Sequence, residues 1–197
     1  MCTLNSPVNT LEDRLMLDLG HGSDARQKMT GILETPRLIL RHQVLSDLDD
    51  LWSLYCDPEI TKYIPDAPKS YEEAREELEW HMNGHPKFPE LGLWATIHKS
   101  TGKFIGRCGL LPWVIDDRSE VEVAYTIARE FWGQGLATEA ARSILQYGFN
   151  ELGYPRLISL IDPENIASQR VAEKIGMKFE KDGCDELGPY RVYSIAK

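Results

Sequence analysis

The sequence lacks any apolar run that approaches the roughly 18–20 residues of a membrane-spanning helix. Near the N-terminus, Glu12, Asp13 and Arg14 stand where a secretory signal would have its apolar region. The four cysteines show no spacing typical of a metal site, so we read them as free thiols in a reducing compartment. These absences predict a cytoplasmic protein with no membrane-spanning segment.

Positive charge and metal-binding histidine patterns are also scarce. The chain has 22 Lys and Arg residues against 31 Asp and Glu residues, which gives a net charge of −9 at pH 7. Nucleic-acid binding relies on Lys and Arg, so we expect no nucleic-acid partner. His81 and His85 have a ligand-like spacing, but Gly84 and Pro86 interrupt a helix there, and we predict no metal. The acidic balance suits a cationic substrate, although solubility alone would also explain it.

A glycine-containing stretch two-thirds of the way along the chain carries the strongest functional signal. The alternating run at 121–127 predicts a strand, and a helical pattern extends from 136 to about 152. Gly133 and Gly135 therefore stand where a strand turns into a helix. The first turn of a helix has unpaired N–H groups and a partial positive charge, which together suit a phosphate. We interpret residues 132–138, here called the cradle, as a diphosphate site; a simple glycine bend is the alternative.

Three kinds of phosphate loop compete for this stretch. A P-loop needs a lysine directly after its last glycine, and neither glycine here has one. A dinucleotide-binding loop has a third glycine where this chain has Thr138, and it lies in a first strand–helix unit. The third pattern, Arg/Gln-x-x-Gly-x-Gly/Ala, resembles the acyl-CoA loop of the GNAT superfamily of N-acetyltransferases. The chain matches it from Trp132 to Ala137, with Trp at the first position.

The order of predicted elements supports the same resemblance. Ser46 is expected to cap a first helix that ends near Asp57, and Ser70 with Glu73 forms a capping box for a second helix that extends to Met82. Strands are expected at 34–41, 93–97, 104–111, 119–127, 156–161, 177–181 and 190–195, and further helices at about 136–152 and 165–175. We treat residues 1–33 as an N-terminal extension, expected to be partly disordered, and 34–197 as one domain.

Two further motifs strengthen the resemblance to the RimJ/RimL-like branch of that superfamily. One lies at residues 34–41, and the other extends from Asn165 to Met177. The resemblance implies a mixed α/β fold with a mostly antiparallel sheet and helices on both faces. It also implies that two parallel strands, 119–127 and 156–161, splay into a V that holds the pantetheine arm of acetyl-CoA.

The resemblance also implies which residues hold the co-substrate. Backbone groups of Thr126, Ile127 and Ala128 would contact pantetheine, and Asn165 would contact CoA near the end of the V, although Asn is also a good helix N-cap. Ser168 and Arg170 are the other two residues that the resemblance implies as contacts of acetyl-CoA. The cradle amides would hold the diphosphate; they belong to Trp132, Gly133, Gln134, Gly135, Leu136, Ala137 and Thr138.

The implied reaction is direct transfer of acetyl from acetyl-CoA to an amine, which needs a base. We choose Glu122, because a Glu on a central strand is less often merely solvated than one on a helix; Glu120, on the same face, is the alternative. Many family members have a tyrosine seven residues after the asparagine, but this chain has Ala172 there. Ser168 is the predicted acid, with Tyr190 and Tyr193 left open.

Other functions remain compatible with the sequence. The chain could be a non-catalytic acyl-CoA-binding domain that acts as a sensor, or an interaction protein built on the acidic residues at 72–79 and the N-terminal extension. The acceptor is left open among a peptide N-terminus, a polyamine and an amine antibiotic. The sequence also leaves both a monomer and a homodimer open.

Overall fold

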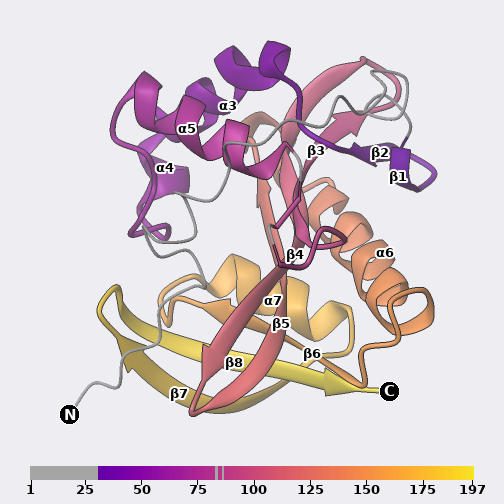
Figure 1. Ribbon diagram of the computed structural model, residues 1–197, viewed down its shortest axis with the longest axis vertical. Helices are drawn as coiled ribbons and strands as arrows, with labels where there is room; N and C mark the ends of the chain where they lie inside the picture. The colour runs from indigo at the N-terminus through magenta and orange to yellow at the C-terminus, as the bar shows by residue number, and fades with distance from the viewer. Residues whose placement is uncertain (1–30, 83, 86) are drawn as a thin grey trace.

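The computed structural model describes residues 31–82, 84–85 and 87–197 (Figure 1). Most of the predicted N-terminal extension, together with Cys2, therefore lies outside the described residues. Within the described part, strands and helices alternate in the order expected for a mixed α/β fold.

Eight strands in the described part form one sheet, in the order β1-β2-β3-β4-β5-β6-β8-β7. All neighbouring strands are antiparallel except β5 and β6, which are parallel, so the prediction of a mostly antiparallel sheet is confirmed. The strands are β1 (Gly31–Glu34), β2 (Leu38–Arg41), β3 (Gly92–His98), β4 (Lys103–Ile115), β5 (Arg118–Ile127), β6 (Arg156–Ile161), β7 (Lys178–Asp185) and β8 (Gly188–Ala196).

The helices largely follow the predicted capping signals. Ser70 caps α5, since its hydroxyl accepts a hydrogen bond from the Glu73 amide at 3.1 Å. Ser46 does not cap α3, because a 3₁₀ turn precedes that helix and puts Asp47 at its start. The helices are α3 (Leu48–Tyr55), α4 (Pro58–Thr61), α5 (Tyr71–His81), α6 (Leu136–Asn150) and α7 (Ile166–Lys174), with 3₁₀ turns η1 (Leu45–Asp47) and η2 (Arg129–Phe131).

The predicted first strand, 34–41, is in fact two strands joined by a turn. The Thr35 amide donates to Leu38 O and the Leu38 amide donates to the Thr35 hydroxyl, each at 2.9 Å. Pro36, which has no N–H, lies within this turn and suits it better than a strand interior. Because β1 folds back on β2, the turn at residues 35–37 lies at one end of the sheet's first hairpin.

Two main hydrophobic clusters hold the fold together. The larger one joins the sheet to α6 through residues such as Leu38, Leu110, Val123 and Ile144, all 1% exposed or less. A second cluster packs α3, α4 and α5 against each other. Figure 1 shows these three helices grouped apart from α6 and α7. A smaller apolar cluster, centred on Ile115, Ile158, Tyr190 and Val192, lies beneath the β4–β5 hairpin.

Candidate active site

The β5 and β6 strands separate soon after they meet. Within the described residues their register contains a single pair, Glu122 opposite Ile158. Just beyond it, the Ser159 hydroxyl donates to Val123 O at 2.8 Å, so a side chain replaces a ladder hydrogen bond. Backbone groups past this point need other partners, because buried strand N–H and C=O groups are rarely left unpaired. The two strands therefore diverge beyond this pair, and we call the region between their diverging ends the opening.

Glu122 lies where the two strands part. Its side chain is buried, with 8% of the residue exposed. One carboxylate oxygen accepts from the Trp113 indole N–H at 2.7 Å, and the other accepts from the Leu160 amide at 3.1 Å. Burial raises the pKa of Glu122 to about 7, against the lowering effect of these two hydrogen bonds. A carboxylate with this pKa can accept or release a proton near neutral pH.

Glu120, the alternative base, has a different environment. Both of its carboxylate oxygens accept from Arg156 Nε, at 3.1 and 3.2 Å. Arg156 also forms an ion pair with Glu180 at 2.7 Å. Glu120 is therefore part of an ion-paired group, whereas no ion pair is present at Glu122 within the described part of the chain.

The cradle has the backbone conformation that an anion site requires. Gly133 and Gly135 have φ values of 74° and 77°, in the left-handed region that glycine tolerates best. Gly135 is the N-cap of α6, and the Glu139 amide makes the first intrahelical bond, to Gly135 O at 3.0 Å. No hydrogen bond within the described residues uses the amides of residues 133–138. The Trp132 amide differs from our prediction, because it donates to Arg129 O at 3.0 Å.

Thr126 and Ala128 direct backbone groups toward β4, and their predicted contacts with pantetheine stay predictions. A Cβ placed on Gly106 of β4 would lie 2.0 Å from Thr126 O, so this carbonyl points toward β4 and away from the opening. The Ala128 amide donates to Ile105 O of β4 at 2.7 Å. Ile127 O accepts from the Trp132 indole at 2.6 Å. Because backbone direction alternates along a strand, Val123 and Tyr125 direct their backbone groups away from β4; Val123 O is already bound by the Ser159 hydroxyl, which leaves Tyr125 facing the opening.

The start of α7 faces β5 across this opening. Asn165 is the N-cap of α7, and its side chain accepts from the Ser168 amide at 3.1 Å. Tyr125 reaches across from β5 and donates its hydroxyl to Ser168 O at 2.9 Å. Tyr125 ends the Glu-x-x-Tyr pattern that begins at Glu122, but the sequence does not predict its contact with α7. Arg170 is exposed, and no hydrogen bond or ion pair of its side chain is seen within the described range.

The two tyrosines left open as acids have other surroundings. Tyr193 is buried and donates its hydroxyl to Gln169 Oε1 at 3.2 Å. Tyr190 packs in the small apolar cluster with Ile115 and Val192. Ser168 is half-buried, and its hydroxyl forms no hydrogen bond to another described residue. The Ser168 hydroxyl therefore differs from that of Tyr193 in having no hydrogen-bond partner among the described residues.

Acidic groups are concentrated on the side of the sheet where α5 lies. Glu77 of α5 forms an ion pair with the buried Arg107 at 2.9 Å and accepts from the Tyr55 hydroxyl at 2.6 Å. Burial raises the pKa of Asp66, and repulsion from Glu77 raises it further. Asp66 in turn raises the pKa of Glu122, so these three carboxyl groups share one electrostatic environment.

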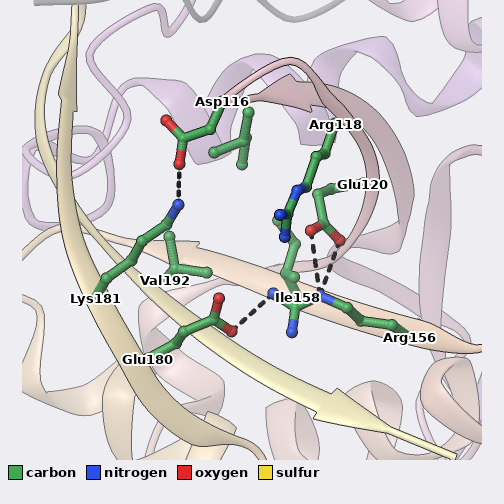
Figure 2. Close-up of a pocket in the computed structure, with 9 residues that line it drawn as sticks. Asp116, Arg118, Glu120, Arg156, Ile158, Glu180, Lys181 and Val192 are labelled. Carbon is green, nitrogen blue, oxygen red and sulfur yellow. Dashed lines mark hydrogen bonds and ion pairs between the residues drawn. The ribbon is translucent and has the colours of Figure 1, made fainter.

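A pocket of about 250 Å³ lies beside Ile158, the register partner of Glu122 (Figure 2). Figure 2 shows its acidic side chains in ion pairs, with Asp116 bound to Lys181 and Arg156 bound to both Glu120 and Glu180. These contacts join the tip of the β4–β5 hairpin to β7. The pocket therefore has mutually compensated charges, unlike the α5 side of the site.

Other kinds of site receive no support in the described ranges. No three His, Cys, Asp or Glu side chains there converge in a way that could hold a metal ion. Among the same residues, no helix has the length and apolar character needed to cross a membrane. Cys56, Cys108 and Cys184 form no disulfide within these residues, and Cys108 is buried.

Comparisons with known proteins identify the family and the fold. The family model described as "Acetyltransferase (GNAT) domain" matches residues 37–178. The chain is 40% identical over 162 residues to the uncharacterized protein YkkB of Bacillus subtilis, covering 82% of this chain and 93% of that protein. It is 32% identical to the uncharacterized N-acetyltransferase p20 of Bacillus licheniformis, covering 77% and 83%. A GNAT-family acetyltransferase structure from Bacillus anthracis superposes with a TM-score of 0.71 at 25% identity, covering 83% and 97%.

Proposed function

The chain belongs to the GNAT family of N-acetyltransferases, and from this premise we propose that it transfers acetyl from acetyl-CoA to a primary amine by direct attack in a ternary complex. The acceptor is a peptide N-terminal amine or a small amine. The observation that carries the proposal is the position of Glu122, a buried carboxyl group with a pKa of about 7 at the point where β5 and β6 separate.

The residues present fit acetyl-CoA. The amides of residues 133–138 have no protein partner in the described part, and the start of α6 adds its partial positive charge. These groups would hold the diphosphate. The opening between β5 and β6 would take the pantetheine arm, where backbone groups of Tyr125 and the Ile127 N–H would satisfy its amides. Asn165 and Arg170 remain proposed contacts, and the bound acetyl-CoA supplies an activated thioester.

Glu122 is the proposed general base. An amine attacks only in its neutral form, and an α-amino group has a pKa of ~7.7–8.0, against ~10.4 for a lysine. A base with a pKa of about 7 is well matched to the α-amino group, because proton transfer between the two is nearly balanced. Trp113 and Leu160 hold the carboxylate in place from either side. Ser168, whose hydroxyl has no described partner, is the proposed proton donor to the leaving sulfur.

The acceptor is proposed to be cationic before it reacts. Asp66 and Glu77 share an electrostatic environment with Glu122, and their charges favour a protonated amine over a neutral or anionic molecule. Arg107 cancels one of these charges by pairing with Glu77. Peptides with a basic N-terminal region and polyamines are the classes to test first.

A thiol-release assay with a panel of amines tests the proposal, and Glu122→Gln is its central variant. We expect kcat to fall by about 100-fold or more, within the range for loss of a general base. The affinity for CoA should stay close to that of the wild type, because Glu122 lies on the α5 face of β5. Glu120→Gln is the matched control, since it changes the same residue type two positions away. Unchanged turnover in Glu122→Gln, or a larger loss in Glu120→Gln, would contradict the assignment.

A further inference from the structure

Arg37 lies in the β1–β2 turn but contacts the cradle, about a hundred residues further along the chain. Its Nη1 donates to Gln134 O at 2.9 Å, and its Nε donates to Glu139 Oε2 at 2.6 Å. Its backbone amide donates to the other oxygen of Glu139 at 2.9 Å. A Cβ added to Gly135 would meet Arg37 Nη2 at 3.8 Å. The guanidinium group therefore lies directly against the cradle backbone.

The contact with Gln134 O fixes the direction of an unpaired amide. A trans peptide is planar, and its C=O and N–H point in opposite directions. Gln134 O and the Gly135 N–H belong to the same peptide unit. Because Arg37 binds the oxygen on one side of the loop, the Gly135 N–H points to the other side. Arg37 thus acts from behind the loop, on the face opposite to the one where this amide can meet a ligand.

Glu139 places a negative charge in the first turn of α6, next to the proposed diphosphate site. Although burial raises its pKa, hydrogen bonds from the Thr35 hydroxyl at 2.6 Å and from Arg37 lower the pKa of Glu139 below its usual range. The carboxylate is therefore ionised at neutral pH. An uncompensated carboxylate there would repel a diphosphate, so Arg37 has a second role as its counter-charge.

We infer that Arg37 is a positioning residue for the diphosphate of acetyl-CoA: it orients the Gly135 amide and cancels the charge of Glu139. This inference rests on the proposed function, because it concerns the same co-substrate. It concerns affinity for the diphosphate part of CoA and leaves the chemistry at Glu122 unaffected.

Binding measurements on the full chain can test this inference with CoA and with pantetheine, which lacks the diphosphate. For Arg37→Ala we expect CoA to bind about 10-fold more weakly by calorimetry, equivalent to ~1.4 kcal/mol. Pantetheine affinity, followed by ligand-observed NMR, should stay unchanged. Lys99→Ala is the matched control, because Lys99 binds Glu34 and Thr35 O in the same turn without touching the cradle.

Charge compensation is tested by removing Glu139's charge as well. Glu139→Gln keeps an oxygen for Arg37 and removes one negative charge, so CoA should bind at least as tightly as in the wild type. The double variant Arg37→Ala with Glu139→Gln should bind CoA more tightly than Arg37→Ala alone. If Arg37→Ala is too unstable to study, Arg37→Lys tests the same inference, because lysine keeps the charge but loses the forked geometry of the guanidinium group. The CoA affinity of Arg37→Lys should be lower than that of the wild type, by less than the 10-fold loss expected for Arg37→Ala.

Several results would overturn the inference. They are wild-type CoA affinity in Arg37→Ala, an equal loss for CoA and pantetheine, an equal loss in Lys99→Ala, or no recovery in the double variant. A wild-type protein that binds no CoA would overturn the proposed function as well. A wild type that binds CoA, with an Arg37→Ala variant that binds it equally well, would overturn the inference alone.

Discussion

At the scale of single residues, the environment of Glu122 explains how one carboxyl group can titrate near neutral pH. Burial raises its pKa, and the hydrogen bonds from Leu160 and Trp113 lower it. These opposing effects make the pKa adjustable, because each donor can be changed separately. They also distinguish Glu122 from Glu120, whose carboxylate binds a guanidinium group.

The pH dependence of Trp113→Phe follows from this balance. If Glu122 is the base, kcat/KM of the wild type should rise with pH through about 7 as the carboxyl group loses its proton. The Trp113 indole stabilises the ionised form, so its removal raises the pKa of Glu122. We expect the rising limb of kcat/KM to move to higher pH in Trp113→Phe, measured across pH 5–9 with one acceptor. The limb should disappear in Glu122→Gln. A limb that stays in place in Trp113→Phe would argue that another group titrates.

At the scale of elements, the β4–β5 hairpin combines local strain with a long-range contact. Its turn residues Asp116 and Asp117 have φ values of 49° and 60°, in the left-handed region that glycine adopts freely and that aspartate tolerates at some cost. Asp116 is bound to Lys181 of β7, whereas no hydrogen bond or ion pair is seen at Asp117 within the described residues. The Asp116 side chain therefore links the hairpin to β7, whereas the Asp117 side chain makes no such link.

This difference predicts the effect of glycine at each turn position. Asp117→Gly should raise the free energy of unfolding by up to ~1 kcal/mol, because glycine adopts the left-handed backbone conformation without strain and the Asp117 side chain has no described hydrogen bond or ion pair to lose. Asp116→Gly relieves similar strain but loses the ion pair with Lys181. Chemical denaturation of the two variants beside the wild type measures both effects. Destabilisation by Asp117→Gly would show that its carboxylate has a structural role.

The elements also show what could be predicted from sequence. The cap at Ser70, the strand at 156–161 and the strand–cradle–helix unit follow from local signals, and the structure has them. The apolar residues after Pro36 predict a single strand over 34–41, whereas the structure has a turn at Pro36 between β1 and β2. The backbone direction of Thr126 depends on its pairing with β4, which a side-chain pattern does not specify. The contact of Arg37 with Glu139 joins residues 102 positions apart, and no local signal predicts such a contact.

At the scale of the whole molecule, co-substrate binding should be visible as stability. A ligand that binds the folded state alone stabilises it by about 2.7 kcal/mol at a concentration 100 times its dissociation constant. For a chain of 197 residues we expect CoA at this level to raise the melting temperature by roughly 5–10 °C. Differential scanning fluorimetry with CoA, and with pantetheine as the control, checks this. No shift at saturating CoA would contradict the proposed cradle.

The single pairing between Glu122 and Ile158 has a mechanical consequence for the protein. The backbone ladder makes β1 to β5 one leaf, and it makes β6, β7 and β8 another, with one described pair between the two. Side-chain packing of α6, which touches β4, β5 and β6, therefore joins the two leaves in addition to this one pair. A ligand bound between the two leaves would contact both of them. We therefore expect the form with bound co-substrate to be more rigid than the form without it.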